Sequence, residues 1–174
     1  MSPAVRRTLV LLGALVLTLV PGLTPGAAAA APAGYRIVSV VAVSAGPDSV
    51  GCAVDVTTTY RLPEVSEATY MRFYQFRLPD IASSPPTVDI DEATQVGTPP
   101  PDRPWDVRWQ LTQRFAEVGL DDASRTWIWG AQLLSGYWDD EWVTTPLTQL
   151  ALTKPFHGRD GICPPVGKVI AKGH

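Results

Sequence analysis

Three consecutive carboxylates stand between two tryptophans in the stretch SGYWDDEWVTT. The residues are Trp138, Asp139, Asp140, Glu141 and Trp142. Adjacent carboxylates can bind calcium, or one can protonate a glycosidic oxygen while another attacks the sugar, and indoles can stack on sugar rings. These five residues therefore form the candidate binding site of a carbohydrate-binding module or a carboxylate-dependent glycosidase.

The same stretch also has a structural interpretation. Gly136 and the carboxylates are typical of a hairpin tip, with Trp138 ending one strand and Trp142 beginning the next. Side chains alternate in direction along an extended chain, so three in a row can converge on one ligand only in a tight turn. We favour an exposed tip whose carboxylates diverge into water, because neighbouring anions repel and burying one without partners is costly.

A second acidic stretch, DIDE, places Asp89 and Asp91 on one face of an extended chain. The two carboxylates could present oxygens to a cation. The stretch lacks the glycine and the downstream glutamate of a full calcium loop, and acidic residues are common in polar loops. We therefore expect no metal and no other cofactor.

Histidine chemistry is limited by the number of histidines, since the chain has only His157 and His174. A Ser-His-Asp triad would have to use His157, with Asp160 near it in KPFHGRDGICPP, but the glycines and prolines of this stretch indicate a loop. The chain has no G-x-S-x-G motif, phosphate-binding glycine loop or dinucleotide fingerprint. A small hydrolase around His157 is thus a third hypothesis, and our prediction is that the chain is not an enzyme.

The first residues resemble an export signal. Arg6 and Arg7 precede the apolar run 8–20, which is followed by an alanine-rich tract with several A-x-A cleavage registers. We expect residues 1–31 to be a cleaved signal peptide, with an uncleaved anchor as the alternative. Paired arginines also fit a twin-arginine signal loosely, although general secretion is favoured.

Export would leave an acidic chain outside the cytoplasm. Loss of two of the 14 basic residues leaves 12 against 17 acidic residues, a net charge of −5. Such a charge disfavours a nucleic-acid partner. No later apolar run is long enough for a transmembrane helix, so we expect a secreted protein without stable membrane insertion.

The two cysteines, Cys52 and Cys163, both follow the signal. An even number of cysteines in an exported chain favours a disulfide, and neither lies in a C-x-x-C motif or beside a histidine that would favour redox or nucleophilic chemistry. The predicted bond would join the second strand to the C-terminal segment and stabilise the fold.

The hydrophobic pattern predicts strands in most of the chain. Residues 34–45 are rich in β-branched side chains, and in 50–60 one face is formed by Val50, Cys52, Val54 and Val56. Residues 68–78 alternate with aromatic residues on both faces. Residues 125–134 and 141–153 are expected to pair around the acidic tip, with Pro146 at an edge or bulge.

Residues 105–118 allow two secondary structures. Trp105, Val107, Trp109, Leu111 and Phe115 share one face of a strand. A helix competes, because Val107, Leu111, Phe115 and Val118 are also spaced by four, four and three, and Gly119 could cap its end. The aromatic and β-branched content favours the strand.

Six to eight short strands predict an all-β fold, a single antiparallel β-sandwich that is immunoglobulin-like in the loose sense. The domain would span residues 32–174, with a Pro-rich, largely extended connection at 79–104 containing a short strand at TVDI. A sandwich does not specify a function. We predict a non-catalytic protein that recognises an unknown extracellular protein or glycan.

Overall fold

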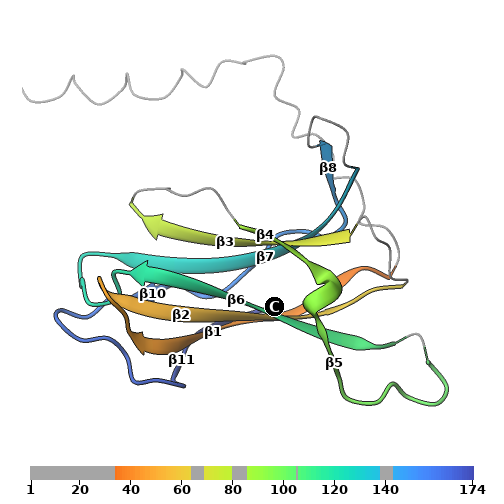
Figure 1. The fold of residues 1–174 in the computed structure, drawn as a ribbon, viewed down its shortest axis with the longest axis horizontal. Helices are drawn as coiled ribbons and strands as arrows, with labels where there is room; N and C mark the ends of the chain where they lie inside the picture. The colour runs from red at the N-terminus through yellow and green to blue at the C-terminus, as the bar shows by residue number, and fades with distance from the viewer. Residues whose placement is uncertain (1–33, 64–68, 80–85, 105, 138–142) are drawn as a thin grey trace, which may run out of the picture. The chain divides into compact units, whose positions relative to one another are not determined.

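A computed structural model describes residues 34–63, 69–79, 86–104, 106–137 and 143–174. These residues belong to one compact unit, Ala31–His174, and form two antiparallel sheets that pack together (Figure 1). The predicted all-β fold is confirmed, and the described residues contain no α-helix. Within this part of the chain no helix is long and apolar enough to cross a membrane. The predicted signal peptide, residues 1–31, lies outside the described residues.

The first sheet, sheet A, contains the strands β11-β1-β2-β6-β5 in that order. Their bounds are β1 Arg36–Pro47, β2 Cys52–Arg61, β5 Thr94–Val96, β6 Arg108–Val118 and β11 Val169–Gly173. The second sheet, sheet B, has the order β10-β7-β3-β4, and β8 and β9 also pair with β7. Its bounds are β3 Thr69–Leu78, β4 Thr87–Asp89, β7 Thr126–Tyr137, β8 Val143–Pro146, β9 Ala151–Leu152 and β10 Phe156–His157.

Backbone segments link sheet A and sheet B at both edges of the sandwich-like fold. On one side β4 of sheet B continues through the 3-10 helix η1 (Ile90–Glu92) into β5 of sheet A, as Figure 1 shows. This crossing occupies part of the predicted Pro-rich connection. On the other side Thr153 bridges to Gly173, and the Lys154 amide donates a hydrogen bond to the Lys172 carbonyl at 2.9 Å. The two sheets are therefore joined by backbone on both sides.

The core lies between the sheets and follows from the alternation of side chains. Val54 and Val56 of β2 are buried, as are Phe73 of β3 and Trp129 of β7. Alternate side chains of β7 are buried between the sheets, namely those of Trp127, Trp129, Ala131 and Leu133. Residues 108–118 form β6, so the strand prediction there is confirmed in place of the helix.

The predicted orientation of one side chain, that of Val50, was wrong. Val50 was predicted to share a strand face with Cys52, but its side chain is 74% exposed whereas Cys52 is fully buried. The reason is that β2 begins only at Cys52, and Val50 lies in the preceding turn. In that turn Asp48 accepts hydrogen bonds from the Val50 and Gly51 amides at 3.1 and 2.9 Å.

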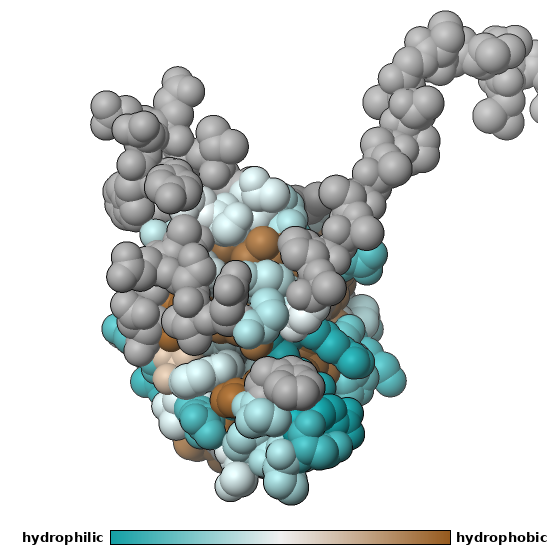
Figure 2. All heavy atoms as spheres, turned by 90° about the vertical axis from the view of Figure 1, so that its right-hand side faces the viewer, coloured by the Kyte–Doolittle hydropathy of each residue, from teal (hydrophilic) through white to brown (hydrophobic). Residues whose placement is uncertain are grey.

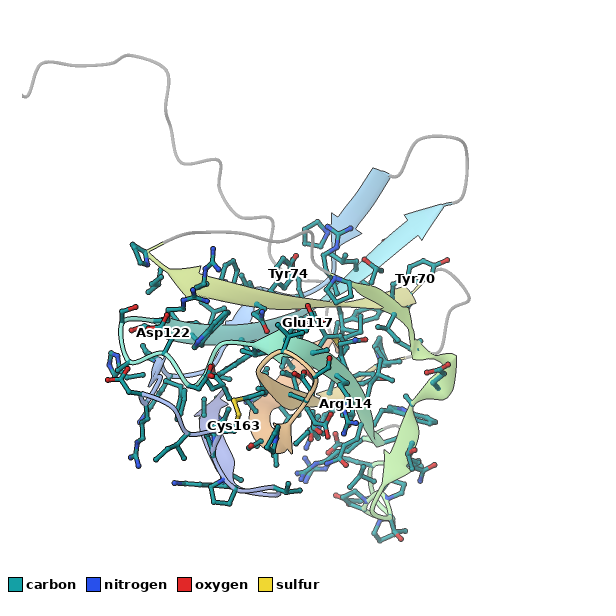
Figure 3. The ribbon with its side chains drawn as sticks, turned by 60° about the vertical axis from the view of Figure 1, so that its left-hand side comes forward. Tyr70, Tyr74, Arg114, Glu117, Asp122 and Cys163 are labelled. Atoms are coloured by element: carbon teal, nitrogen blue, oxygen red, sulfur yellow. A yellow bond between two sulfur atoms is a disulfide. The ribbon has the colours of Figure 1, made fainter. Side chains whose placement is uncertain are left out.

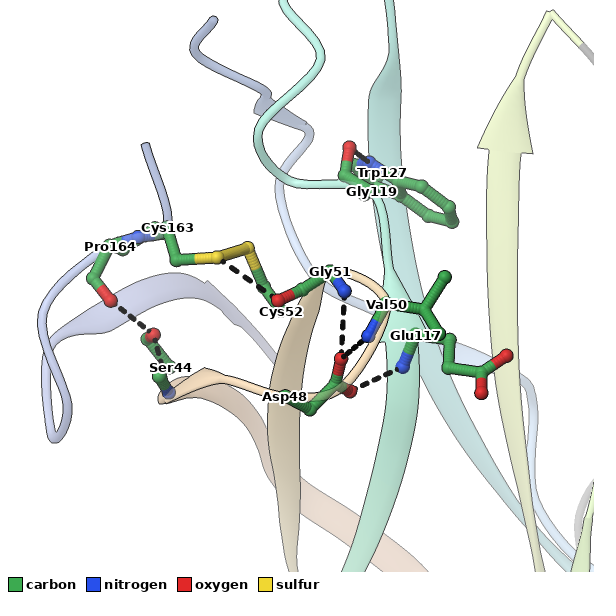
Figure 4. Close-up of a disulfide and its surroundings, with 11 residues drawn as sticks. Ser44, Asp48, Val50, Gly51, Cys52, Glu117, Gly119, Trp127, Cys163 and Pro164 are labelled. Atoms are coloured by element: carbon green, nitrogen blue, oxygen red, sulfur yellow. Dashed lines mark hydrogen bonds between the residues drawn. A yellow bond between two sulfur atoms is a disulfide. The ribbon is translucent and has the colours of Figure 1, made fainter. Parts of the chain in front are cut away.

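The predicted disulfide between Cys52 and Cys163 is present, with the two Cα atoms 5.7 Å apart. Figure 4 shows that it fastens the C-terminal segment to the turn between β1 and β2. The Ser44 hydroxyl adds a hydrogen bond to the Pro164 carbonyl at 2.6 Å. Cys52 is fully buried, so the bond is anchored in the core.

Candidate functional site

The sequence-predicted site lies between β7 and β8 in the chain. β7 and β8 pair with Leu134 opposite Pro146 and Tyr137 opposite Val143, which confirms the predicted pairing of the two strands. The connection between them is 138–142. All five candidate residues, Trp138, Asp139, Asp140, Glu141 and Trp142, lie outside the described residues, so the exposed-tip and ligand-site interpretations both stay predictions.

The second acidic stretch does not form the extended segment that was expected. Asp89 ends β4, and Asp91 lies in η1, so the chain changes conformation between them. The same-face spacing of an extended chain therefore does not apply. Among the described residues, no group of three or more His, Cys, Asp or Glu side chains could hold a metal ion.

His157 belongs to β10 and lies opposite Thr126 of β7. Its Nδ1 shares a hydrogen bond of 2.8 Å with the Thr126 hydroxyl. Asp160, the expected triad partner, instead accepts a hydrogen bond from the Ala123 amide at 3.1 Å. The hydrogen bonds of His157 and Asp160 thus hold this segment against the start of β7 and the turn before it.

Ser124, in the turn before β7, is also engaged in turn structure. The Ser124 hydroxyl donates to Asp122 Oδ1 at 2.6 Å, and the Ser124 amide donates to the same oxygen at 2.9 Å. The hydrogen bonds from Ser124, together with Arg125, hold the pKa of Asp122 below its ordinary value. Ser124, His157 and Asp160 are therefore each bound to a different partner, and these hydrogen bonds do not connect them as a triad.

Sheet B carries a partly exposed apolar face that was not predicted from the sequence. One face of β3 points away from the core and carries Tyr74, Phe76 and Leu78. Their partners on β7 are Gly130, Ile128 and Thr126, respectively. The Tyr74 and Phe76 rings are stacked, with centroids 5.9 Å apart and planes 9° apart. The Tyr74 hydroxyl donates to Gln132 Oε1 at 2.9 Å, which fixes the orientation of the stack.

Two leucines complete this surface. Leu152 lies opposite Gly130, and a Cβ built on Gly130 would lie 2.7 Å from Leu152 Cδ2 and 3.2 Å from Leu150 Cδ1. Leu150 and Leu152 can lie over the strand only because residue 130 has no side chain. Their side chains remain 36% and 42% exposed. We call the set Tyr74, Phe76, Leu78, Ile128, Leu150 and Leu152 the apolar face.

The outer surface of sheet A is polar and largely bonded to itself. The Thr57 and Thr112 hydroxyls are 2.8 Å apart, and Gln110 donates to the Thr59 hydroxyl at 3.2 Å. Arg114 forms a bidentate pair with Asp55 at 2.7 and 2.9 Å, and this hydrogen bond raises the pKa of the Arg114 guanidinium. Figure 3 shows Tyr74 and Arg114 on the two different sheets.

The aromatic residues on both faces of 68–78 were the available signal for the apolar face. That alternation was visible in the sequence, but the leucines reach the same surface through the pairing of β9 with β7, which the pattern does not specify.

Comparison with known proteins supplies no further assignment, because no protein-family model, no curated protein and no solved structure matches the chain significantly.

Proposed function

We propose that the chain is an exported, non-catalytic recognition domain that binds an extracellular protein through the apolar face. In this proposal residues 1–31 are a cleaved signal peptide, and the fold is immunoglobulin-like in the loose sense. The disulfide supports an extracellular location, since such bonds persist in oxidising compartments. The connections between the sheets support the fold assignment: β2 is followed by β3, β6 by β7, and each pair has one strand in each sheet.

The observation that carries the proposal is the exposure of Leu150 and Leu152 beside the Tyr74 and Phe76 stack. Apolar side chains that gather on one face of a soluble domain commonly mark a protein interface. Aromatic and leucine side chains gain free energy when a partner removes them from water, and the Tyr74 hydroxyl, already bonded to Gln132, needs no new partner. A protein surface with a matching apolar patch fits these requirements.

The test compares two pairs of substitutions at exposed apolar residues. The full chain, purified after expression, is immobilised and exposed to extracellular proteins of the source organism, and the retained proteins are cross-linked and identified by mass spectrometry. We expect Leu150→Ser with Leu152→Ser to reduce retention of a defined partner by about tenfold or more, a loss of about 1.4 kcal/mol. The control pair, Val50→Ser with Val166→Ser, lies outside the apolar face and is expected to bind like the parent. Equal retention by both pairs would contradict the proposal.

The alternative, a glycan site at Trp138–Trp142, is separated by a second variant. Asp139→Ala with Asp140→Ala is expected to change the free energy of unfolding by less than about 0.5 kcal/mol and to leave partner retention unchanged. A glycan array and a calcium titration check the rival reading. If the parent protein binds a glycan or calcium and this variant does not, the acidic tip is the functional site.

A further inference from the structure

Three arginines lie side by side at one end of sheet A. Arg36 of β1 is opposite Arg61 of β2, and Arg61 is opposite Arg108 of β6. All three alternate with inward residues such as Tyr60 and Leu111, so they share the outer face of the sheet. Neighbouring strands are about 4.8 Å apart, so the three Cα atoms span only about 10 Å. We call Arg36, Arg61 and Arg108 the arginine row.

The arginine row is poorly neutralised within the described residues. Asp106 pairs with Arg61 at 2.5 Å, and its side chain is only 15% exposed. Among the described residues, no carboxylate forms an ion pair with Arg36 or Arg108, and both side chains are exposed. Like charges directly opposite each other destabilise a sheet. A chain with an overall net charge of −3 thus holds a local excess of positive charge at this end.

The donors that a ligand could reach belong to the outer two arginines. The Nε of Arg61 is buried and makes no hydrogen bond in the described structure, so a ligand on the surface of the sheet would not reach it. Asp106 is bound through Nη1 of Arg61, whereas the guanidiniums of Arg36 and Arg108 are exposed. A planar anionic group placed across the arginine row would supply acceptors and reduce the repulsion.

The surroundings of the row restrict the class of anion. The next positions on the same face are Thr59, Gln110 and Thr94, which add hydroxyl and amide groups beside the guanidiniums. Hydrophilic side chains gather over sheet A in the lower half of the end that faces the viewer in Figure 2. Trp109 and Tyr60 of the adjoining positions pack toward the core, so they are not exposed rings on which bases could stack.

We propose that the arginine row binds an anionic polysaccharide. Its spaced charged groups would lie on the guanidiniums, and its hydroxyls would bond to Thr59, Gln110 and Thr94. An acidic protein repels a polysaccharide with one charge per sugar less than it repels nucleic acid, because the overall repulsion grows with the charge density of the polymer. The site is separate from the apolar face, so the domain has two binding surfaces, one on each sheet.

The test uses polygalacturonate as the probe and its fully methyl-esterified form as the uncharged match. Binding to the purified protein is measured with the polymer immobilised, at about 20 and about 200 mM salt, since exposed ionic contacts weaken as salt rises. We expect the parent to bind only the charged polymer and to bind about tenfold more weakly at the higher salt. We expect Arg36→Gln with Arg108→Gln to weaken binding by about tenfold or more at low salt.

Two controls isolate the arginine row. Arg114→Gln removes an arginine of the same face that is paired with Asp55, and Leu150→Ser with Leu152→Ser disrupts the apolar face; both should bind polygalacturonate within about twofold of the parent. Thermal melts verify folding, and the single substitutions, each expected to weaken binding by about threefold, replace the double variant if it does not fold. The proposal fails if the parent ignores polygalacturonate, if the esterified polymer binds equally, or if the arginine variants match the parent. Tighter binding of single-stranded DNA or of anionic vesicles would also overturn it.

Discussion

Asp48 is the residue on which the turn between β1 and β2 depends. One carboxylate oxygen of Asp48 accepts hydrogen bonds from the amides of Val50 and Gly51. The other oxygen accepts a hydrogen bond of 2.6 Å from the amide of Glu117 in β6 (Figure 4). The hydrogen bond from Glu117, followed by that from Val50, lowers the pKa of Asp48 below its ordinary value of 3.8. One side chain thus fixes a turn in one strand pair and a position in the neighbouring strand.

Replacement of Asp48 by alanine is expected to lower the melting temperature at neutral pH, because three backbone donors lose their acceptor. The folded-state pKa is depressed, so the stabilisation is fully present above pH 3.8 and is lost as the pH falls through the folded-state value. Thermal melts between about pH 7 and about pH 2 should show the gap between parent and variant closing. Asp121→Ala, at an exposed carboxylate, is the control. A gap that persists at the acidic end would refute the role of the charge.

Tyr60 places a polar hydroxyl in the apolar core. Its side chain is fully buried, and its hydroxyl has no hydrogen-bond partner in the described structure. Burial raises the pKa of this phenol. Its aromatic ring packs in the core while its hydroxyl pays a desolvation cost.

Tyr60→Phe is expected to raise the free energy of unfolding by about 1 kcal/mol, because it removes an unsatisfied buried hydroxyl and keeps the ring. Tyr74→Phe provides the opposite case, since the Tyr74 hydroxyl bonds to Gln132 and its loss should cost about 0.5–1 kcal/mol. Urea unfolding of both variants measures the two signs. Destabilisation by Tyr60→Phe would mean that its hydroxyl has a partner in solution.

Among the elements, β6 contains a bulge that changes which side chains face inward. The pairing with β2 shifts between Val54 opposite Phe115 and Cys52 opposite Val118. Glu117 lies in this shift with a φ of 56°, a left-handed conformation that costs non-glycine residues about 1–2 kcal/mol. Because of the bulge, the inward position after Phe115 is taken by Val118, which is fully buried.

Glu117→Gly should therefore raise the free energy of unfolding by up to about 1 kcal/mol, because glycine adopts this φ without strain and keeps the amide that donates to Asp48. Glu117→Val should lower it, since a β-branched side chain tolerates the left-handed region least. Both are measured by urea denaturation. Similar losses in the two variants would show that the Glu117 side chain, and not the backbone, determines stability.

The bulge also shows the limit of prediction from sequence at this scale. The alternation of Trp109, Leu111 and Phe115 identified β6 as a strand, because burial on one face imposes a period of two. The inserted residue at Ala116–Glu117 breaks that period, so the inward position of Val118 required the observed pairing. Val50 was placed wrongly for a related reason: the strand boundary depends on the Asp48 turn, which alternation alone does not locate.

The candidate sites depend on register in the same way. The sequence shows Arg36, Arg61 and Arg108 as isolated residues, each about 25–47 positions from the next. Only the pairing of β1, β2 and β6 makes them neighbours. The acidic tip, by contrast, was apparent because its residues are consecutive, and the pairing of β7 with β8 could be predicted from its two flanking strands.

At the scale of the whole molecule, the disulfide closes a loop of 111 positions. A loop of this order contributes up to about 4–5 kcal/mol by restricting the unfolded chain. The bond acts together with the Ser44 to Pro164 hydrogen bond, so the C-terminal segment is fastened to the β1–β2 turn at two points.

Cys52→Ser with Cys163→Ser is expected to lower the free energy of unfolding by about 2–4 kcal/mol, measured by urea denaturation. A reductant should destabilise the parent by a similar amount and leave the double variant unchanged. If reductant lowers the stability of both proteins equally, the effect does not come from this bond.

The pairing of β1 with β11 has a consequence for how the chain is made. Val40 lies opposite Gly173, so the first described strand has the last described strand as its neighbour. During synthesis, which proceeds from the N-terminus, sheet A cannot be completed before β11 has left the ribosome. The closing step of sheet A therefore joins residues 133 positions apart, a non-local contact of the kind that slows folding.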